Sequence, residues 1–245
     1  MSKEQQLADK VFSLPSQQLE AVRGQPQKVI DLIELLSEGH WMWIGREKAK
    51  AIKRKITEYD TKPKIFAELG GFVGYLAILL SDILFTDPDS RYYSFELNQE
   101  FANIARRFIE LAGLSSQVEV IVGPAAISLR KFCESQEHRG ISKFDFVLID
   151  HWKPQYVPDL RVLESFNLIG TNSVIVADNI LVPGAPEYRA FIKMTPEQKR
   201  SYNYEHPNPA GADYTGRWNV VYKTEEVPVE GDILAVTRCV DYLCL

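Results

Sequence analysis

The chain has 245 residues, 45% of them hydrophobic and 25% charged, which is the composition of a soluble globular protein with one sizeable core. Its formal net charge of −5 argues against a protein whose main function is to bind nucleic acid. The three cysteines, Cys133, Cys239 and Cys244, lack the CxxC spacing of a zinc site or a disulfide framework and are compatible with a reducing compartment.

The first residues of the chain show no sign of a targeting segment. The N-terminal decapeptide, MSKEQQLADK, is polar and mixed in charge, unlike a secretory signal peptide. The most apolar stretch, Phe72–Phe85, is too short to span a bilayer and contains Ser81 and Asp82. We therefore expect a soluble, cytoplasmic protein with no membrane partner and no nucleic-acid partner.

The N-terminal part of the chain predicts helices around one aromatic turn. Pro15 divides residues 1–23 into short pieces, and the apolar positions that follow recur at helical spacing until Gly39. Trp41–Gly45, WMWIG, is a short apolar turn that either plugs the core or covers a ligand. Arg46–Tyr59 predicts a basic amphipathic helix, and its lysines and arginines are best interpreted as a solvated face.

From residue 64 onwards, short apolar strands alternate with helices. This alternation is typical of α/β folds with a doubly wound, parallel sheet. The strands are expected at Lys64–Glu68, Tyr92–Phe95, Val118–Val122, Phe144–Ile149 and Ser173–Ala177. The helices are expected after the glycine-rich turn LGGFVGY as far as Phe85, and at Gln99–Ala112, Pro124–Ser135, Pro158–Phe166 and Pro186–Lys193.

The C-terminal tail has a different character. Asn203–Gly216 is rich in Asn, Pro, Gly and Tyr and is expected to form a loop. Trp218–Tyr222 and Ile233–Thr237 predict two strands, joined by an acidic, proline-containing connection into a terminal hairpin. The chain shows no internal repeat and no interdomain linker, so we expect a single domain.

Acidic side chains follow two of the predicted strands. Asp150 follows the fourth strand, and Asp178 and Asn179 follow the fifth. Neighbouring strands lie about 4.8 Å apart, and open α/β sheets bind ligands at the carboxyl ends of their strands, so these side chains can converge. Two carboxylates and an amide oxygen suit Mg²⁺. Either aspartate alone is more simply explained as a helix cap, but the pair, with Trp152 and Lys153 beside it, favours a site.

A glycine-rich turn links the first predicted strand to its helix. In Glu68–Gly74, ELGGFVG, the glycines allow the backbone to approach a ligand closely, although tight packing of strand against helix explains them equally well. Glu96 ends the second predicted strand, a position from which an acid can hydrogen-bond ribose hydroxyls in such folds. Together the turn and the acid indicate a ligand that contains adenosine, either NAD or S-adenosylmethionine.

The candidate metal site favours S-adenosylmethionine. A methyltransferase that acts on hydroxyl groups can use a cation that binds two neighbouring oxygens, lowers the pKa of a hydroxyl and fixes its position. Lys153 lies three residues after Asp150 and can take the hydroxyl proton if it is partly desolvated. Taken alone, Lys153 is better explained by a surface ion pair. Trp152 offers a flat face to an adenine or an aromatic substrate, or packs in the core.

Four motifs, in this order and spacing, resemble the catechol O-methyltransferase family of class I, S-adenosylmethionine-dependent and Mg²⁺-dependent enzymes. The motifs are AELGGFVGY, FELN, LIDHWK and ADNILVPGAP, and WMWIG with its basic helix matches the family's N-terminal region. The resemblance extends roughly over Gln25–Ala190. The last two motifs are highly specific, whereas the glycine turn and FELN occur in many methyltransferases.

The resemblance implies a fold and a reaction. The fold is a Rossmann-like, doubly wound sheet of seven mostly parallel strands with a C-terminal antiparallel hairpin, in one domain over residues 1–245. Residues 1–60 would form a helical cap over the cofactor, and residues 64–245 the Rossmann-like core. The implied reaction is the Mg²⁺-dependent transfer of the methyl group of S-adenosylmethionine to a hydroxyl of a catechol-like small molecule, carried out by a monomer.

The resemblance also implies roles for individual residues. Lys153 is the implied general base, and Asp150, Asp178 and Asn179 are the implied Mg²⁺ ligands. The implied cofactor contacts are Met42, Glu68, Gly70, Phe72, Tyr75, Glu96, Leu97, Gly123, Ala125, Asp150, His151 and Trp152. The implied substrate contacts are Trp41, Asp150, Trp152, Lys153, Asn179 and Pro183.

Three departures from the family pattern leave alternatives open. Leu76 stands where the family has a serine that holds the methionine carboxylate, and Gly123–Ala126, GPAA, stands where it has GASQ near the adenine. Val221 stands where the family has a glutamate that binds the second catechol hydroxyl; Glu225 or Glu226 can replace it only if the register slips. The alternatives are an O-methyltransferase with a non-catechol acceptor and a catalytically silent S-adenosylmethionine-binding homologue. A NAD-dependent oxidoreductase is disfavoured because the strict GxGxxG motif is absent.

Overall fold

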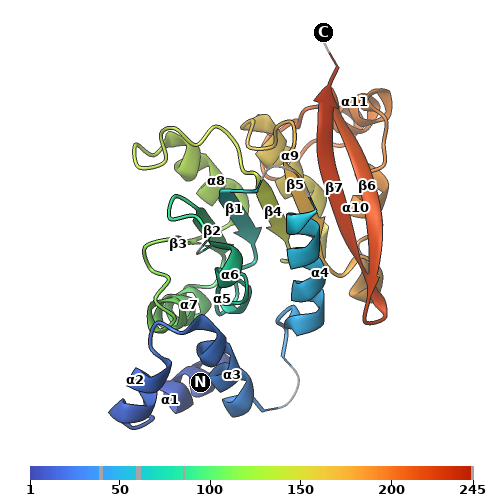
Figure 1. The fold of residues 1–245 in the computed structure, drawn as a ribbon. Helices are drawn as coiled ribbons and strands as arrows, with labels where there is room; N and C mark the ends of the chain where they lie inside the picture. Colours follow the sequence, from blue (N-terminus) through green and yellow to red (C-terminus); the bar gives the residue numbers. More distant parts are fainter. Residues whose placement is uncertain (39–40, 59–61, 85, 244–245) are drawn as a thin grey trace.

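The structure is a computed structural model that describes residues 1–38, 41–58, 62–84 and 86–243. Gly39, Tyr59 and Phe85, which the sequence analysis used as helix ends, lie outside the described residues, as does Cys244. From residue 64 onwards, strands and helices alternate as expected (Figure 1).

Within the described residues, seven strands form one sheet in the order β3-β2-β1-β4-β5-β7-β6. The five strands β1 to β5 are parallel, and β7 is antiparallel to both β5 and β6. This arrangement confirms the predicted Rossmann-like sheet with a C-terminal antiparallel hairpin. The strands are β1 (Ile65–Leu69), β2 (Arg91–Glu96), β3 (Val118–Val122), β4 (Phe146–Ile149), β5 (Val174–Ala177), β6 (Val220–Val229) and β7 (Asp232–Tyr242).

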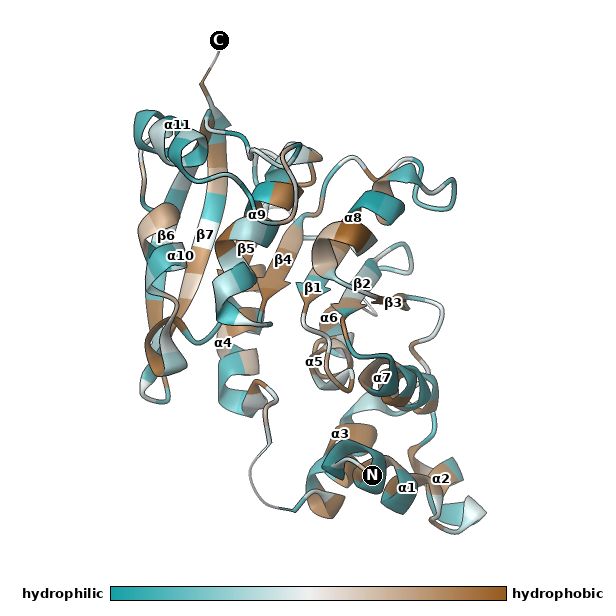
Figure 2. Ribbon diagram, turned by 180° about the vertical axis from the view of Figure 1, so that it is seen from behind, coloured by the Kyte–Doolittle hydropathy of each residue, from teal (hydrophilic) through white to brown (hydrophobic). Residues whose placement is uncertain are grey.

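Helices cover both faces of the sheet because the central strands are apolar on both sides. In β4, Phe146 and Leu148 pack into one buried cluster, and Val147 and Ile149 into another; Figure 2 shows this strand as largely hydrophobic. The helices that contribute to the first cluster are α1 (Lys3–Phe12), α3 (Pro26–Leu36), α4 (Gly45–Thr57), α5 (Tyr75–Leu79) and α7 (Gln99–Leu111). Those of the second are α8 (Ala125–Glu134), α9 (Tyr156–Ser165) and α10 (Pro186–Phe191).

Short helices complete the description. The apolar helix expected after the glycine turn divides at Leu80 into α5 and α6. No helix in the described residues combines the length and the apolar character needed to cross a membrane. The remaining elements are α2 (Ser16–Val22), α6 (Ser81–Leu84), α11 (Pro196–Glu205), the 3₁₀ turn η1 (Lys153–Gln155) and the π-helical turn η2 (Ile180–Gly184).

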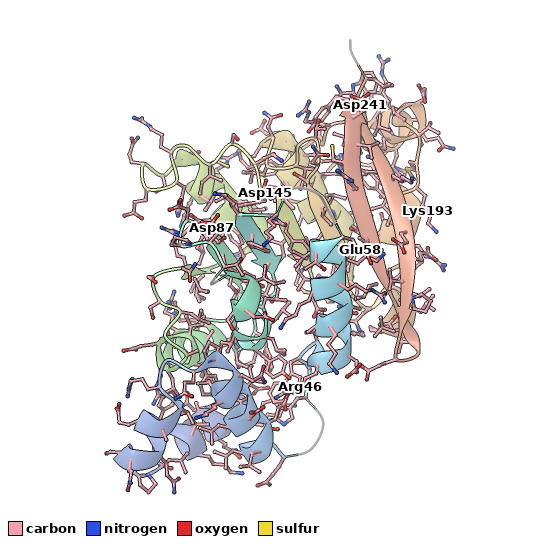
Figure 3. The ribbon with its side chains drawn as sticks, viewed as in Figure 1. Arg46, Glu58, Asp87, Asp145, Lys193 and Asp241 are labelled. Atoms are coloured by element: carbon pink, nitrogen blue, oxygen red, sulfur yellow. The ribbon has the colours of Figure 1, made fainter. Side chains whose placement is uncertain are left out.

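The N-terminal helices belong to the same core as the sheet. Leu7 of α1 and Ile33 of α3 are buried in the first cluster, where α1 and α3 pack against α7 and α5. Arg46 at the start of α4 links this region to α3, because its Nε donates to Glu34 Oε1 at 2.9 Å (Figure 3). The helices α1 to α3 therefore lie near the carboxyl end of β1, from which α5 begins (Figure 1).

The C-terminal hairpin is longer than expected. The segment read as an acidic connection is part of β6, and the turn between the strands contains only Glu230 and Gly231. Proline at position 228 is tolerated because β6 is the last strand in the sheet, and an edge strand can leave one row of donors unpaired. The predicted loop 203–216 is also corrected, since its first residues end helix α11.

Candidate active site

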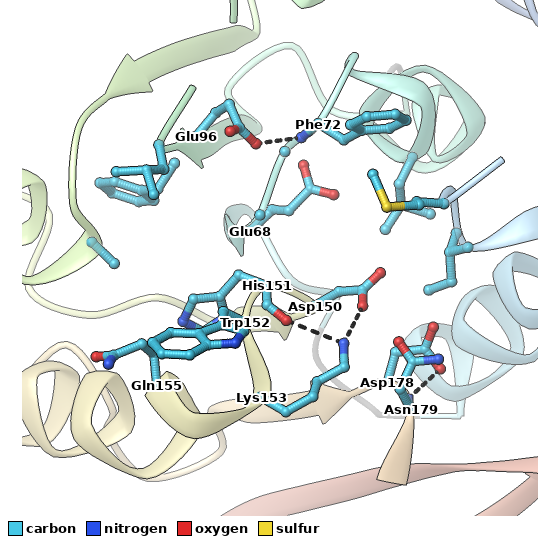
Figure 4. A pocket seen from close by; sticks show the side chains of 18 of the residues that line it. Glu68, Phe72, Glu96, Asp150, His151, Trp152, Lys153, Gln155, Asp178 and Asn179 are labelled. Atoms are coloured by element: carbon cyan, nitrogen blue, oxygen red, sulfur yellow. Dashed lines mark hydrogen bonds and ion pairs between the residues drawn. The ribbon is translucent and has the colours of Figure 1, made fainter. Parts of the chain in front are cut away.

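A pocket of about 1400 Å³ opens at the carboxyl ends of β1 and β4. The chain runs outward from β1 to β2 and β3 and then returns to β4, so this edge is a topological switch point, where doubly wound sheets bind ligands. Every candidate site residue chosen from the sequence lines this pocket, and Figure 4 labels those around Glu68, Glu96 and Asp150. The residues are Trp41, Met42, Glu68, Gly70, Phe72, Tyr75, Glu96, Leu97, Gly123, Ala125, Asp150, His151, Trp152, Lys153, Asp178, Asn179 and Pro183.

The glycine turn after β1 passes directly against β4. Gly70 has a φ of 99°, and a Cβ at this position would lie 2.7 Å from the backbone oxygen of Asp150. Only glycine can therefore occupy this position without displacing the backbone at Asp150. This contact brings the turn and the acidic end of β4 to the same wall of the pocket.

Glu96 connects the glycine turn to the end of β2. Its Oε2 accepts a hydrogen bond from the backbone N–H of Phe72, and its Oε1 accepts one from that of Asn98, both at 2.7 Å. Burial raises the pKa of Glu96, while these backbone donors act in the opposite direction. The carboxylate is thus held in a fixed orientation at the pocket wall.

Glu68 is a second acid of this wall and is more deeply buried. Its Oε2 accepts a hydrogen bond from Ser94 Oγ at 3.0 Å. Burial raises the pKa of Glu68 to about 8; the hydrogen bond from Ser94 opposes this shift, and the charge of Asp150 adds to it. Glu68 is consequently protonated over much of the neutral pH range.

Asp150 and Lys153 form a close pair at the end of β4. Lys153 Nζ lies 3.1 Å from Asp150 Oδ1 and 2.8 Å from the Tyr156 hydroxyl oxygen. Tyr156 in turn donates to the backbone oxygen of Asp178 at 3.2 Å, which ties the ends of β4 and β5 together. Burial raises the pKa of Asp150, and the charge of Asp178 raises it further.

Asp178 and Asn179 lie next to this pair, at the end of β5. Asn179 has a left-handed backbone, with φ 57° and ψ 44°, and its N–H donates to Asp178 Oδ1 at 2.7 Å. Its side-chain Nδ2 donates to the backbone oxygen of Val182 at 3.0 Å. Asp150, Asp178 and Asn179 therefore line the same pocket (Figure 4), and their role as metal ligands stays a prediction.

The structure adds two charged residues that sequence reasoning missed. Lys48 of α4 donates to Asp178 Oδ1 at 2.6 Å and to Asp232 Oδ2 at 3.0 Å. Lys48 and Lys55 are both buried, which corrects the interpretation as a solvated face for these two residues, whereas the side chains of Lys50 and Arg54 are exposed. Burial works against the charge of Lys48, but Asp178 and Asp232 together raise its pKa. The sequence alone contains no signal for Asp232, because its partners lie far away in the chain.

The donor set is suited to a hard divalent cation. Among the described residues, no group of three or more His, Cys, Asp or Glu side chains is placed to hold a metal ion. The candidate set contains two carboxylates, of Asp150 and Asp178, and one amide, of Asn179. Because Asn179 Nδ2 is occupied as a donor, its Oδ1 is the atom left for a cation. Burial raises the pKa of Asp150 and the nearby charge of Asp178 raises it further, and a bound cation would offset both effects.

Aromatic rings cover one side of the pocket. Trp43 lies between Trp41 and Tyr75, with ring centroids 4.8 and 4.7 Å away, and Tyr75 donates a hydrogen bond to Glu34. The WMWIG turn thus both packs against α5 and lines the pocket. Trp152, in the segment that follows β4, lines the pocket and is 69% exposed, so it is not a core residue.

Apolar side chains line the pocket next to the carboxyl ends of β2 and β3. Leu97 is 69% exposed and Ile127 is 52% exposed, and both line the pocket beside Pro124 and Ala125. His151 has its Nε2 within 2.7 Å of Asp159 Oδ2 and stacks on Tyr156. Exposed apolar side chains at the mouth of a concave site favour a ligand with a flat, apolar face.

The acid that the hairpin contributes differs from the one considered in the sequence. Val221 pairs with Asp241 near the far end of β7 and does not line the pocket, so it does not occupy a substrate position. Glu225 is bonded to Lys55, and Glu226 to Arg189. The acid that reaches the pocket is Glu230, in the turn between β6 and β7.

Comparison with known proteins identifies relatives with a common activity in their names. A model of the O-methyltransferase family matches residues 31–189. Catechol O-methyltransferase of Bos taurus is 32% identical over 194 residues, which are 78% of this chain and 66% of the bovine protein. Catechol O-methyltransferase B of Danio rerio is 32% identical over 189 residues, 76% of this chain and 69% of the fish protein. The chain therefore spans about two thirds of the length of these relatives.

Solved structures agree in fold. The O-methyltransferase of Bacillus cereus in complex with SAH has a TM-score of 0.58 and 20% identity, covering 96% of both chains. The O-methyltransferase TomG of Streptomyces achromogenes in complex with SAM has a TM-score of 0.54 and 20% identity, covering 98% of this chain and all of TomG. Since the family model extends over more than half of the residues and the curated relatives agree with it, the chain belongs to the O-methyltransferase family, with the catechol O-methyltransferases among its relatives.

Proposed function

We propose that the protein transfers the methyl group of S-adenosylmethionine to a hydroxyl of a catechol-like small molecule, with Mg²⁺ as the metal. The observation that carries this proposal is the convergence of Lys153, Asp150, Asp178 and Asn179 at the mouth of one pocket. A base beside a set of hard oxygen ligands is the arrangement needed to activate one of two adjacent hydroxyls. The family membership supports the same reaction class.

In the proposed mechanism, Lys153 is the general base. Its Nζ lies beside Asp150 Oδ1 and the Tyr156 hydroxyl, and the neutral amine can accept the proton of the acceptor hydroxyl. Bound Mg²⁺, held by Asp150, Asp178 and Asn179, would lower the pKa of that hydroxyl. Bound S-adenosylmethionine would supply the methyl group to the oxygen that Lys153 deprotonates, with S-adenosylhomocysteine as the leaving group.

The remaining pocket residues are assigned to binding and orientation. We propose that Glu96 holds the ribose hydroxyls and that the glycine turn from Gly70 to Tyr75 contacts the methionine part. Leu97, Gly123, Ala125, His151 and Trp152 would surround the adenine, and Trp41 and Pro183 the acceptor ring. Residues 1–60 are proposed to act as a cap over the cofactor, which is supported by the position of Trp41, Met42 and Trp43 in the pocket lining.

The decisive experiment incubates the purified protein with S-adenosylmethionine and a simple catechol, with Mg²⁺ and then with excess chelator. Methylated product should form with Mg²⁺ and disappear with chelator.

The role of Lys153 is tested separately. Lys153→Arg keeps the positive charge but cannot act as a base, so kcat should fall by about 100- to 10,000-fold. Lys193→Arg, which changes a lysine paired with Glu226 outside the pocket, should leave the rate unchanged. Equal rates with chelator would contradict the metal assignment, and full turnover by Lys153→Arg would contradict the base.

One observation favours a different acceptor. The hairpin presents Glu230 to the pocket, in the turn that follows β6, so the acid available to a second hydroxyl comes from another position than the family pattern implies. A related O-methyltransferase with a non-catechol hydroxyl acceptor is therefore the second candidate. A panel of phenols and catechols distinguishes the two, since a non-catechol that outperforms every catechol would favour the second. We also propose that the protein is a cytoplasmic monomer. Sedimentation of the purified protein tests the oligomeric state.

A further inference from the structure

Two charged side chains from distant parts of the chain meet behind Asp178 and Asn179. Lys48 comes from α4, and Asp232 is the first residue of β7. Their side chains are only 11% and 6% exposed, and their charged groups are 3.0 Å apart. Neither has a part in the reaction proposed above, so their position next to the cation ligands requires its own explanation.

Asp232 is held firmly by backbone donors and in turn orients an amide. Its Oδ1 accepts from the N–H groups of Leu181, Val182 and Ile233, at 2.9, 3.2 and 2.8 Å. Its Oδ2 accepts from Asn179 Nδ2 at 3.2 Å. Because Nδ2 is turned towards Asp232 and the Val182 oxygen, Asn179 Oδ1 is the only part of this amide left for a ligand among the described residues.

Lys48 performs the corresponding task for Asp178. Its Nζ donates to Asp178 Oδ1, which also accepts the N–H of Asn179. No other described donor reaches the carboxylate, so Oδ2 is left for a cation. The same ammonium donates to Asp232 Oδ2, so one lysine fixes the carboxylate directly and the amide through Asp232.

We propose that Lys48 and Asp232 are positioning residues that hold Asp178 and Asn179 in the orientation required for divalent cation binding. This inference rests on the proposed Mg²⁺ site. Groups that hydrogen-bond metal ligands from outside fix the ligand orientation before the ion arrives, and their loss typically weakens cation binding or activity by about 10- to 100-fold. The alternative is that the Lys48 ammonium is a resident cation that occupies the place of the metal.

The two possibilities predict opposite changes in cation affinity. The variants are Lys48→Met and Asp232→Asn, and the readout is the dissociation constant for Mn²⁺ and Mg²⁺ by titration calorimetry, without cofactor or acceptor. Both variants should bind about 10- to 100-fold more weakly. At saturating Mg²⁺ their kcat should recover towards the wild-type value, because neither side chain touches the reacting atoms.

Lys55→Met is the matched control. Lys55 lies on the same helix, is also buried and is also paired with carboxylates, those of Glu58 and Glu225, but it does not line the pocket. It should bind cations as the wild type does, even if its melting temperature falls. If Lys48→Met is insoluble, Lys48→Gln, which keeps a donor without the charge, allows the same comparison.

Three results would overturn the inference. Tighter cation binding by Lys48→Met would show that the lysine competes with the metal. Unchanged affinity in both variants, with a wild type that binds, would show that these residues do not position the ligands while leaving the proposed function intact. Absence of cation binding by the wild type would remove the proposed metal site and this inference with it.

Discussion

At the scale of single residues, Glu68 is a buried acid outside the proposed metal ligands, and its environment strongly opposes ionisation. It is fully buried, and its pKa is raised to about 8, whereas an ordinary glutamate has a pKa near 4.3 when unfolded. The stability that the protonated form contributes is complete below the unfolded pKa and is lost as the pH rises through the folded value. As the pH rises from about 5 to 9, the contribution of Glu68 to the free energy of unfolding of the wild type should therefore decrease.

Glu68→Gln removes this pH dependence because the amide stays neutral. Relative to the wild type, the variant should gain free energy of unfolding as the pH rises from 5 to 9, by roughly 1.4 kcal/mol for each pKa unit of the shift that is realised. Urea unfolding at pH 5, 7 and 9 measures the difference. Glu226→Gln is the control, because its pKa is lowered to about 2 by Arg189 and Lys193, so its effect should be constant over this range. A constant effect of Glu68→Gln would contradict the prediction.

The residues of the site divide into those the sequence could indicate and those it could not. Asp150, Asp178 and Asn179 directly follow apolar strands, and parallel strands bring such positions to one edge, so their convergence could be predicted. Lys48 and Asp232 are placed by the docking of α4 beside the sheet and by the pairing of β7. Neither contact leaves a periodicity or a motif in the chain, so a lysine-rich helix was interpreted as solvated.

At the scale of elements, α11 is a weakly amphipathic helix whose start is marked by a local capping signal. The helix buries only Lys199, so it has no apolar stripe to reveal it. Its start is nevertheless marked by a capping box: Thr195 Oγ1 accepts from Gln198 N at 3.3 Å, and Gln198 Oε1 accepts from Thr195 N at 2.9 Å. Thr-x-x-Gln is visible in the sequence and marks the start of a helix that overlaps the predicted loop only at its first residues, 203–205.

This cap has a measurable energy. Thr195→Ala removes the hydroxyl that accepts from Gln198 N but keeps the backbone N–H that donates to Gln198 Oε1, and should lower the free energy of unfolding by about 1 kcal/mol. Thr195→Ser keeps the hydroxyl and should cost less than half of that. Chemical denaturation of the three proteins gives the values, and an alanine variant as stable as the wild type would show that the box contributes nothing.

The first residues of β6 fall in the predicted strand Trp218–Tyr222, but the rest of the strand could not be recognised, for a different reason. Its residues 223–228, KTEEVP, are charged and end in proline, which is unfavourable in an interior strand. As the edge strand, β6 instead uses its acids in ion pairs: Glu225 with Lys55 of α4, and Glu226 with Arg189 and with Lys193. Charged side chains also suit an edge that must not pair with other chains. Its assignment thus depends on the whole sheet.

At the scale of the whole molecule, the N-terminal helices and the sheet share one core, and the WMWIG turn joins them at the pocket. Trp43 stacks on Tyr75 of α5 and on Trp41, and both tryptophans line the cavity. The proposed cap is thus built on contacts with the core. A ligand that fills the pocket should therefore stabilise the entire chain and not a local segment.

S-adenosylhomocysteine at 100 times its dissociation constant should raise the free energy of unfolding by about 2.7 kcal/mol, equivalent to about 5–10 °C in Tm for a chain of this size.

Trp43→Ala removes the central ring of the stack. If the cap contributes to the cofactor site, a tenfold weaker affinity would reduce the stabilisation by S-adenosylhomocysteine at the same concentration to about 1.4 kcal/mol. Trp218→Ala is the control, because this half-buried tryptophan lies under Arg200 and outside the pocket. It should lower the starting Tm without changing the increment. An undiminished shift in Trp43→Ala would separate the turn from the cofactor site, and a shift with NAD in place of S-adenosylhomocysteine would contradict the cofactor itself.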